Sequence, residues 1–247
     1  MTNKERIILI AGCSHAAGFE LDGGEDSEYN RRNSFGGKLG DLLDRKPVNI
    51  AMGGQSNAAV ARSVLNWFDK EYDSETMDVF VLFAWTEATR IDLPAPEHVE
   101  YSWSNTNTDF YTDINEQFLQ INSGWDGINP FEKQVIPYWH DYQVRNEAMC
   151  LISGANFVLQ MQFFMQAKNI DYVMCNTMPM FTVESKQLDF YLDLVDESKY
   201  LLMRDDSKAF YWYYRNKGYE NEKAKYWHHD AEPHRRQALR LYNFIKG

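Results

Sequence analysis

The chain has 247 residues and a net charge of −11, which argues against nucleic acid or an anionic membrane surface as a partner. Both of those partners are bound through clusters of Lys and Arg. Three cysteines without CxxC spacing argue against a zinc site or a disulfide framework and favour a reducing compartment. No apolar segment near the N-terminus is long enough for a signal peptide or a membrane span, so we expect a cytoplasmic protein.

Four short apolar runs predict buried strands. The first, residues 7–11, is continuous, rich in β-branched side chains and ends at Gly12, which is typical of a strand buried on both faces. Similar runs follow at residues 48–51, 78–84 and 171–176. Helical patterns lie between the first three runs, and this alternation is typical of βαβ units and a parallel sheet. Because the chain has no internal repeat or low-complexity linker, we expect a single domain over residues 1–247.

The alternation changes after the third predicted strand. Residues 91–137 are polar, aromatic and rich in Asn, and we interpret them as an irregular, partly ordered insertion over the edge of the sheet. Residues 138–168 predict one long helix or two shorter ones, with a break near Ser153 and Gly154. Residues 184–203 give a further helical pattern.

Ser14 follows the first predicted strand directly, in the segment Gly12-Cys13-Ser14-His15. Open α/β sheets bind their ligands at the carboxyl ends of the strands, so we expect Ser14 at a binding edge. A Ser at this position either caps a helix or acts as a nucleophile beside free backbone N–H groups that stabilise an oxyanion. The following loop, residues 20–29, is acidic and rich in Gly, and we expect it to form an exposed rim.

Two further segments supply partners for a nucleophilic serine. Gly54 follows the second predicted strand and offers an N–H group with no side chain in the way. His228, His229 and His234 precede or open the last predicted helix, and an activated Ser needs a base such as His within hydrogen-bond reach. The alternative is a metal site, because His228, Asp230 and His234 are all possible ligands.

These segments together resemble four sequence blocks of the SGNH, or GDSL-type, hydrolases. Residues 12–15 resemble the first block, residues 48–56 the second, residues 78–87 the third and residues 228–234 the last. The resemblance implies a three-layer α/β/α sandwich with a parallel, flavodoxin-like sheet.

The resemblance also implies a role for one residue in each block. Ser14 is the nucleophile and supplies one N–H group to the oxyanion hole, and Gly54 supplies a second. Thr86 stands where the family has an Asn that donates to the oxyanion, and its hydroxyl is the equivalent donor. His228 is the catalytic base, and His234 is a structural partner.

The chain departs from the family at two further positions. Cys13 stands where Asp is common, and Lys225 stands three residues before His228, where the family has the acid that holds the base. Because Lys has no acceptor, His228 needs a backbone carbonyl, Asp230 or a carboxylate from elsewhere. Residues 49–57 and 85–90 are similar to a divergent branch of the family that is common among tailed bacteriophages.

We therefore expect a serine esterase that removes a small acyl group, such as acetyl, from a carbohydrate or similar polar ester. No metal or organic cofactor is needed. Candidate substrate contacts are Asn57, Trp85, Arg90 and Trp227, because Arg can bind a carboxylate or phosphate and Trp can stack on a sugar ring.

Two alternatives use the same fold. The first is a catalytically weak or inactive binding or structural protein, for example a component of a phage particle, which places the chain in the host cytoplasm or the virion. The second is an acyltransferase, because access to the pocket decides whether water or another acceptor takes the acyl group. A homo-oligomer is compatible with each of these functions.

Overall fold

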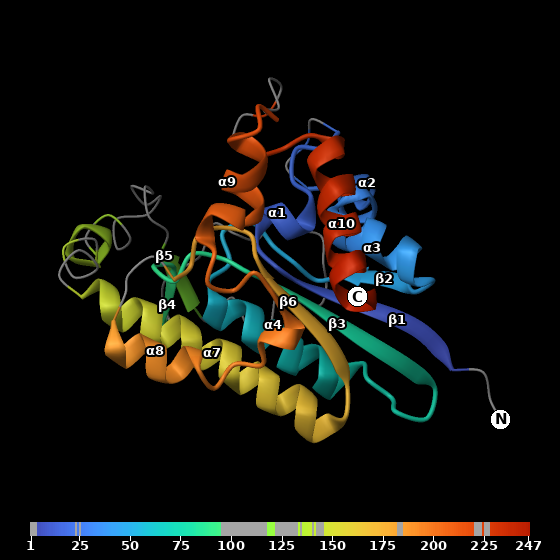
Figure 1. Cartoon of the computed structure of the whole chain (residues 1–247), viewed down its shortest axis with the longest axis horizontal. Helices are drawn as coiled ribbons and strands as arrows, with labels where there is room; N and C mark the ends of the chain where they lie inside the picture. Colours follow the sequence, from blue (N-terminus) through green and yellow to red (C-terminus); the bar gives the residue numbers. More distant parts are fainter. Residues whose placement is uncertain are drawn as a thin grey trace.

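A computed structural model gives the structure of residues 4–22, 24, 26–94, 118–121, 133, 135–139, 141, 146–181, 185–219, 224 and 228–247. Its centre is a five-stranded sheet made of β1 (Glu5–Gly12), β2 (Lys46–Asn49), β3 (Met77–Trp85), β6 (Asp171–Asn176) and β7 (Tyr200–Leu201). The strands lie in the order β2-β1-β3-β6-β7, and every neighbouring pair is parallel (Figure 1). The predicted parallel, flavodoxin-like sheet is therefore confirmed.

Helices cover both faces of this sheet (Figure 1). One face carries α4 (Asn57–Lys70), α7 (Glu147–Lys168) and α8 (Lys186–Leu192). The other carries α1 (Ser14–Ala17), α3 (Phe35–Leu43), α9 (Phe210–Arg215) and α10 (Ala231–Lys246), with α2 (Glu28–Asn33) beside α3. The predicted three-layer α/β/α arrangement is confirmed.

The continuous apolar run of β1 follows from its central place in the sheet. Ile7 and Leu9 join the core beneath α4 and α7, whereas Ile8 and Ile10 join the core beneath α3 and α10. All four side chains are at most 2% exposed. A strand with helices on both faces has no solvent side, so it needs no alternating polar residues.

Of the two alternatives for residues 138–168, the one with a break near Ser153 and Gly154 is wrong. α7 runs without interruption through Ser153 and Gly154. A Cβ on Gly154 would lie 2.8 Å from Met180 Cε and 3.2 Å from Ala88 Cβ. This glycine therefore marks a close approach between α7 and its neighbours, not the end of a helix.

The single helical pattern expected over residues 184–203 is also wrong in part. Among the described residues 185–203, only α8 is α-helical, and it is followed by the 3₁₀ turn Glu197–Lys199 and by strand β7. Tyr200 and Leu201 pair with Met174 and Cys175 of β6. A strand of two residues is too short to leave a periodic signal in the sequence.

The described part of residues 91–137 contains a small two-stranded antiparallel sheet. Its strands are β4 (Ile91–Pro94) and β5 (Phe118–Ile121). An ion pair between Arg62 of α4 and Asp92 of β4 connects this small sheet to α4, and the Asp92 side chain is 1% exposed. The Arg62 guanidinium also lies 3.9 Å from the centre of the Phe118 ring. Most of the predicted insertion lies outside the described residues.

Helix α7 is long and apolar enough to cross a membrane when judged by length and composition alone. In the fold it lies against the sheet, and half of its apolar window is buried inside the protein. Core residues on its inner side include Leu151, Val158 and Met165. Its composition is therefore accounted for by packing within the domain.

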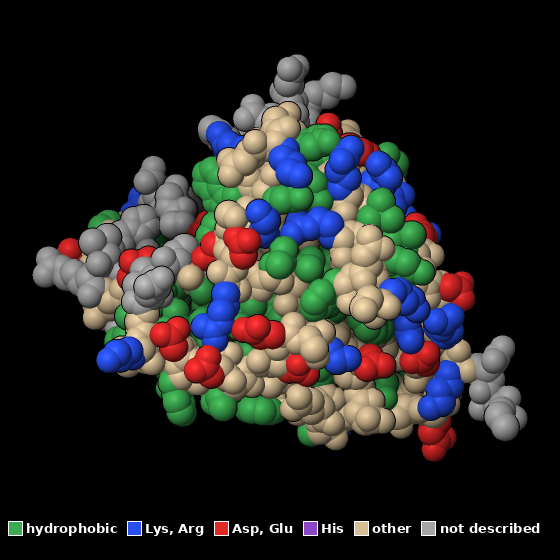
Figure 2. Space-filling model, in the orientation of Figure 1, with side chains coloured by type: hydrophobic (Ala, Val, Ile, Leu, Met, Phe, Trp, Pro, Cys, Tyr) green, Lys and Arg blue, Asp and Glu red, His purple; other side chains and the backbone are tan. Residues whose placement is uncertain are grey.

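The aromatic helix α9 is partly core and partly surface. Phe210 and Tyr214 are at most 1% exposed. The outward Tyr213 ring has Arg240 at 4.1 Å and Lys217 at 4.3 Å from its centre. Lys and Arg side chains gather over α9 and α10 on the face shown in Figure 2, so the net negative charge is unevenly distributed.

We predict that Gly12→Ala destabilises the fold by about 2 kcal/mol or more, because overpacked core sites typically cost about 1–3 kcal/mol. The added Cβ would lie 2.7 Å from both the Ala84 carbonyl oxygen and Ala16 Cβ. The carbonyl belongs to the paired strand β3 and has little freedom to move. The free energy of urea unfolding measures the effect, and a variant as stable as the parent would contradict this account.

Candidate active site

Ser14 lies at the carboxyl edge of the sheet, immediately after β1. The chain leaves β1 at Gly12, whose carbonyl accepts a 3.1 Å hydrogen bond from Met52 N–H in the turn after β2. Cys13 is extended, with φ −93° and ψ −166°, and precedes the first residue of α1. Its buried Sγ lies 3.3 Å from Thr177 Oγ1. These contacts join three strand ends and present Ser14, which is half-buried, at the start of a short helix.

The backbone N–H groups of Ser14 and Gly54 are both available as hydrogen-bond donors. Among the described residues, neither Ser14 N–H nor Gly54 N–H donates a hydrogen bond. Gly54 has φ +74°, a left-handed conformation that glycine adopts without steric cost. Free N–H groups at such a turn and at a helix start are the donors that an oxyanion requires.

His228 lies against the helix that carries Ser14. Its ring centre is 4.9 Å from that of His15 and 5.8 Å from that of Phe19. Its Nδ1 is 2.6 Å from the Glu20 Oε2 atom, and the two side chains are 8% and 5% exposed. Within the described residues, no hydrogen bond joins Ser14 Oγ to His228, and catalytic contacts of this kind are often long without substrate.

Burial is the main reason that the His228 ring is neutral at pH 7. Burial lowers the pKa of His228 below 6.5, and the Glu20 carboxylate opposes that change. The positive charge of Arg90 and the neighbouring His229 ring lower this pKa further. Burial likewise holds the pKa of neighbouring His15 well below 6.5. A neutral imidazole with an acceptor at Nδ1 carries its proton there, and its Nε2 lone pair is then available to a hydroxyl.

The other C-terminal histidines have structural partners. His234 Nδ1 accepts a 3.0 Å hydrogen bond from Phe35 N–H and so joins α10 to the start of α3. Burial lowers the pKa of His234 to about 3. His229 lies with one ring nitrogen 2.8 Å from the Tyr219 carbonyl and the other 2.9 Å from the Tyr211 carbonyl.

The alternative metal site is not assembled in the described part of the chain. No group of three His, Cys, Asp or Glu side chains there lies close enough to hold a metal ion. Asp230 instead forms the N-cap of α10, where its side chain accepts a hydrogen bond from Glu232 N–H. The bond from Phe35 N–H uses the Nδ1 lone pair of His234.

Asn57 is expected to contact substrate, but in the structure its side chain is hydrogen-bonded to the backbone of Thr86. Its side chain accepts a 2.9 Å hydrogen bond from Thr86 N–H and donates a 3.1 Å bond to the Thr86 carbonyl. Because Asn57 is 2% exposed and its carbonyl and amide are both used, it does not face the solvent. The pair fastens the start of α4 to the end of β3.

The structure also corrects the expectation for Trp85. This side chain is fully buried and stacks on Phe83 with ring centres 5.3 Å apart, so no face is open to a sugar. Thr86 is fully buried as well, and within the described residues its Oγ1 has no hydrogen-bond partner. Its hydroxyl has a proton to give, but substrate reaches it only if neighbouring groups move.

Arg90 remains near the site, with a side chain that is 14% exposed. Its Nε lies 3.5 Å from a Glu87 carboxylate oxygen. Its charge lowers the pKa of both His228 and His15, after the larger effect of burial. Trp227 and Lys225 lie outside the described residues.

Glu20 is the residue that sequence reasoning missed. The acidic loop was expected to be an exposed rim, but Glu20 is 5% exposed. It is separated from His228 by 208 positions, so no local pattern connects the two residues. Two features of the sequence could have indicated an acid from this loop as the partner of His228. Lys225 has no acceptor atom, and several acidic residues closely follow Ser14.

In comparisons with known proteins, the chain is similar to two solved structures at low sequence identity. No protein-family model and no curated protein matches the chain. The psychrotrophic esterase EstA from Pseudoalteromonas sp., in a structure inhibited by monoethylphosphonate, is 12% identical with a TM-score of 0.46, over 98% of this chain and 97% of that one.

A putative lipolytic protein of the G-D-S-L family from Desulfitobacterium hafniense DCB-2 is 13% identical. Its TM-score is 0.35, over 97% of this chain and 99% of that one. At such low identities and TM-scores, these similarities assign neither an activity nor a residue to this chain. The resemblance to a phage branch of the SGNH hydrolases stays a prediction.

We predict that Asn57→Ala lowers the free energy of unfolding by about 2 kcal/mol or more, because each buried polar group left unpaired costs roughly 1–3 kcal/mol. The substitution strips partners from Thr86 N–H and C=O in a fully buried position.

The matched control is Asn33→Ala, which removes an exposed bond from Asn33 Nδ2 to the Tyr29 carbonyl. Chemical unfolding of both variants measures the difference. Equal losses would show that the contacts between Asn57 and Thr86 do not stabilise the site.

Proposed function

We propose that the protein is a serine esterase in which Ser14 is the nucleophile and His228 the general base. The observation that carries this proposal is the packing of His228 against α1 with its Nδ1 bonded to a carboxylate. That bond leaves Nε2 as the nitrogen that can accept a proton. The free N–H groups of Ser14 and Gly54 add donors for a developing negative charge.

In the acylation step, Ser14 Oγ attacks the ester carbonyl while its proton passes to His228 Nε2. A new bond forms between Oγ and the carbonyl carbon, and the carbonyl electron pair becomes an oxyanion held by Ser14 N–H and Gly54 N–H. Collapse of this intermediate breaks the bond to the alkoxide. The alkoxide takes the proton from His228 and leaves as an alcohol.

In the deacylation step, water takes the place of Ser14. His228 accepts a proton from the attacking water, and the same N–H groups hold the second oxyanion. Ser14 then leaves with the proton from His228, and the acid is released. The hydroxyl of Thr86 is a third candidate donor. It is buried, so it can reach the oxyanion only after the groups that cover it move.

A small acyl group on a polar alcohol is the substrate that the surroundings favour. Phe19 lies between His228 and the loop that carries Gly54, and a Cβ on Gly53 would be 2.7 Å from the Phe19 ring. This ring takes up space beside the oxyanion donors, which favours acetyl over long acyl chains. Arg90 adds positive charge near the site and suits a polar or acidic alcohol such as a sugar.

We expect a fluorophosphonate probe to label Ser14 in the folded protein, because the probe reports an activated serine. Ser14→Ala is expected to abolish labelling and to reduce hydrolysis of p-nitrophenyl acetate by about 10³-fold or more. Mass spectrometry of the labelled peptide identifies the site.

Ser207→Ala is the matched control, since Ser207 is an exposed hydroxyl in the 3₁₀ turn Asp206–Lys208. Labelling of the folded parent at another residue, or none at all, would refute the esterase and favour a binding or structural role. Faster turnover of octanoyl than of acetyl esters would contradict the preference for small acyl groups.

We predict that the acid limb of kcat/KM falls below pH 6.5. The pKa of His228 is lowered, so the base is neutral at pH 7 and is lost only as the pH falls through that lowered value. The rate constant should be flat from pH 8 to about pH 6.5 and then fall by about tenfold per pH unit below the pKa. A pH–rate profile for the parent protein tests this, and an acid limb above pH 7 would be inconsistent with His228 as the base.

A further inference from the structure

We propose that Glu20 is the positioning carboxylate of His228, and that the buried side chain of Asn30 holds the loop that presents it. The proposal rests on the proposed function, because it assigns further residues to the same site. Both residues act through His228 and do not touch the reacting atoms.

An imidazole that works as a base at Nε2 is favoured when another group accepts its Nδ1 proton. The acceptor fixes the tautomer and the orientation of the ring, and it stabilises the imidazolium that forms. Glu20 supplies such an acceptor, with Oε2 2.6 Å from His228 Nδ1 and both side chains buried. The lysine at position 225 has no acceptor atom.

The backbone of Glu20 has a left-handed conformation, which indicates that surrounding contacts hold this residue in place. Glu20 has φ +66°, and nearby Gly18, which ends α1, has φ +78°. Two left-handed residues so close together turn the chain sharply after the helix of Ser14. A non-glycine residue keeps this conformation only where its surroundings enforce it, and such residues cluster at functional sites.

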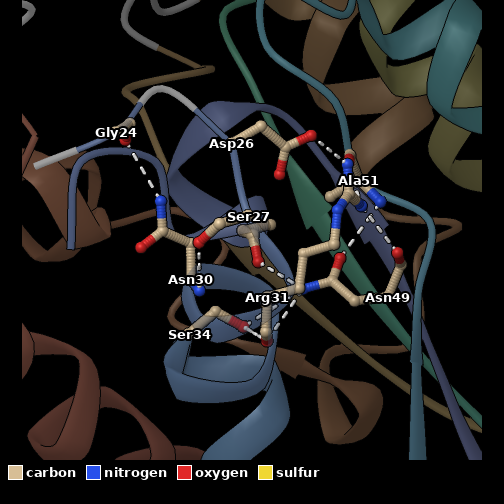
Figure 3. A network of polar contacts seen from close by, with 9 residues as sticks. Gly24, Asp26, Ser27, Asn30, Arg31, Ser34, Asn49 and Ala51 are labelled. Carbon is tan, nitrogen blue, oxygen red and sulfur yellow. Dashed lines mark hydrogen bonds and ion pairs between the residues drawn. The ribbon is translucent and has the colours of Figure 1, made fainter. Parts of the chain in front are cut away.

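Asn30 is the centre of the contacts that enforce the turn. It is fully buried, its Oδ1 accepts a 3.0 Å bond from Asp22 N–H, and its Nδ2 donates a 3.1 Å bond to the Gly24 carbonyl. The same Gly24 carbonyl accepts a 2.8 Å bond from Glu20 N–H. Figure 3 shows Asn30 pointing to Gly24 across this loop. The contacts join Glu20 to α2 through one buried amide.

The next residue of α2 fastens the same loop to the sheet. Arg31 Nη1 donates to the carbonyls of Asn49 and Ala51 at 2.7 and 2.9 Å, and its Nη2 pairs with Asp26 at 2.6 Å (Figure 3). Because β2 is an edge strand, its outward carbonyls lack a strand partner. α2 therefore holds the Glu20 loop on one side and the strand before Gly54 on the other.

The first test needs no substitution. At pH 7, nitrogen and proton NMR of the His228 ring in the intact protein should show the Nδ1–H tautomer with a downfield, hydrogen-bonded Nδ1 proton. The Nε2–H tautomer would overturn the proposal. This measurement does not depend on turnover and remains valid if a variant fails to fold.

The second test compares E20Q and E20D with E28Q, which removes an exposed acid from the first turn of α2. The charged groups that act on His228 are Glu20, Arg90 and His229, with neutral His15 in contact. Loss of the Glu20 charge in E20Q should lower the His228 pKa by about one unit or more. E20D keeps a carboxylate, so its His228 pKa should lie between those of E20Q and the parent. E28Q should match the parent.

The labelling rate of Ser14 should fall by about 10²-fold or more in E20Q, less in E20D and not in E28Q. An unchanged rate and an unchanged His228 pKa in folded E20Q would refute the role of Glu20 and leave the esterase standing. An unlabelled parent whose His228 pKa still depends on Glu20 would refute the esterase and leave the pair standing.

The part assigned to Asn30 is tested by N30A. This variant keeps the carboxylate but removes both amide contacts, so the His228 pKa should fall between the values for the parent and E20Q. A His228 pKa and a labelling rate equal to those of the parent would exclude Asn30 from the proposal.

Discussion

The contact between Glu20 and His228 is the constraint on which the candidate site depends. A carboxylate withdrawn from water is costly unless it is paired and hydrogen-bonded, and here the imidazole supplies the partner at 2.6 Å. The pair joins the loop after α1 to the segment before α10, which come from opposite ends of the chain. Separation of these segments would break the hydrogen bond between Glu20 and His228, so this contact favours the docked arrangement.

The strand ends beneath this pair are fastened by polar contacts of the backbone. Met52 N–H bonds to the Gly12 carbonyl, and Asn57 bonds to both backbone groups of Thr86. Thr177 N–H bonds to the Trp85 carbonyl at 2.7 Å. These contacts hold Ser14 and the loop of Gly54 at the edge of the sheet. The proposed oxyanion hole requires donors that are fixed in this way before the reaction.

The fold was largely predictable from the sequence. β1, β3 and β6 are buried on both faces, and their continuous apolar runs predict buried strands of a parallel sheet. β7 was not predictable, because its two residues gain their strand conformation from pairing with β6. The candidate site was predictable where residues adjoin a strand end, as Ser14 and Gly54 do, and where histidines precede the last helix, as His228 does. The remaining site predictions failed because of burial. Trp85 and Asn57 are buried away from solvent, and Glu20 is buried beside His228. Burial of this kind depends on contacts between residues that are distant in the sequence.

The order of the site residues along the chain has a consequence for biosynthesis. The serine and the acid lie in one short N-terminal stretch, but the histidine follows the acid by 208 positions. Contacts of such long range are costly to close and form late. The proposed base His228 therefore reaches the proposed nucleophile Ser14 only after all five strands of the sheet have been made. Reactivity at Ser14 would then serve as a reporter of completed folding.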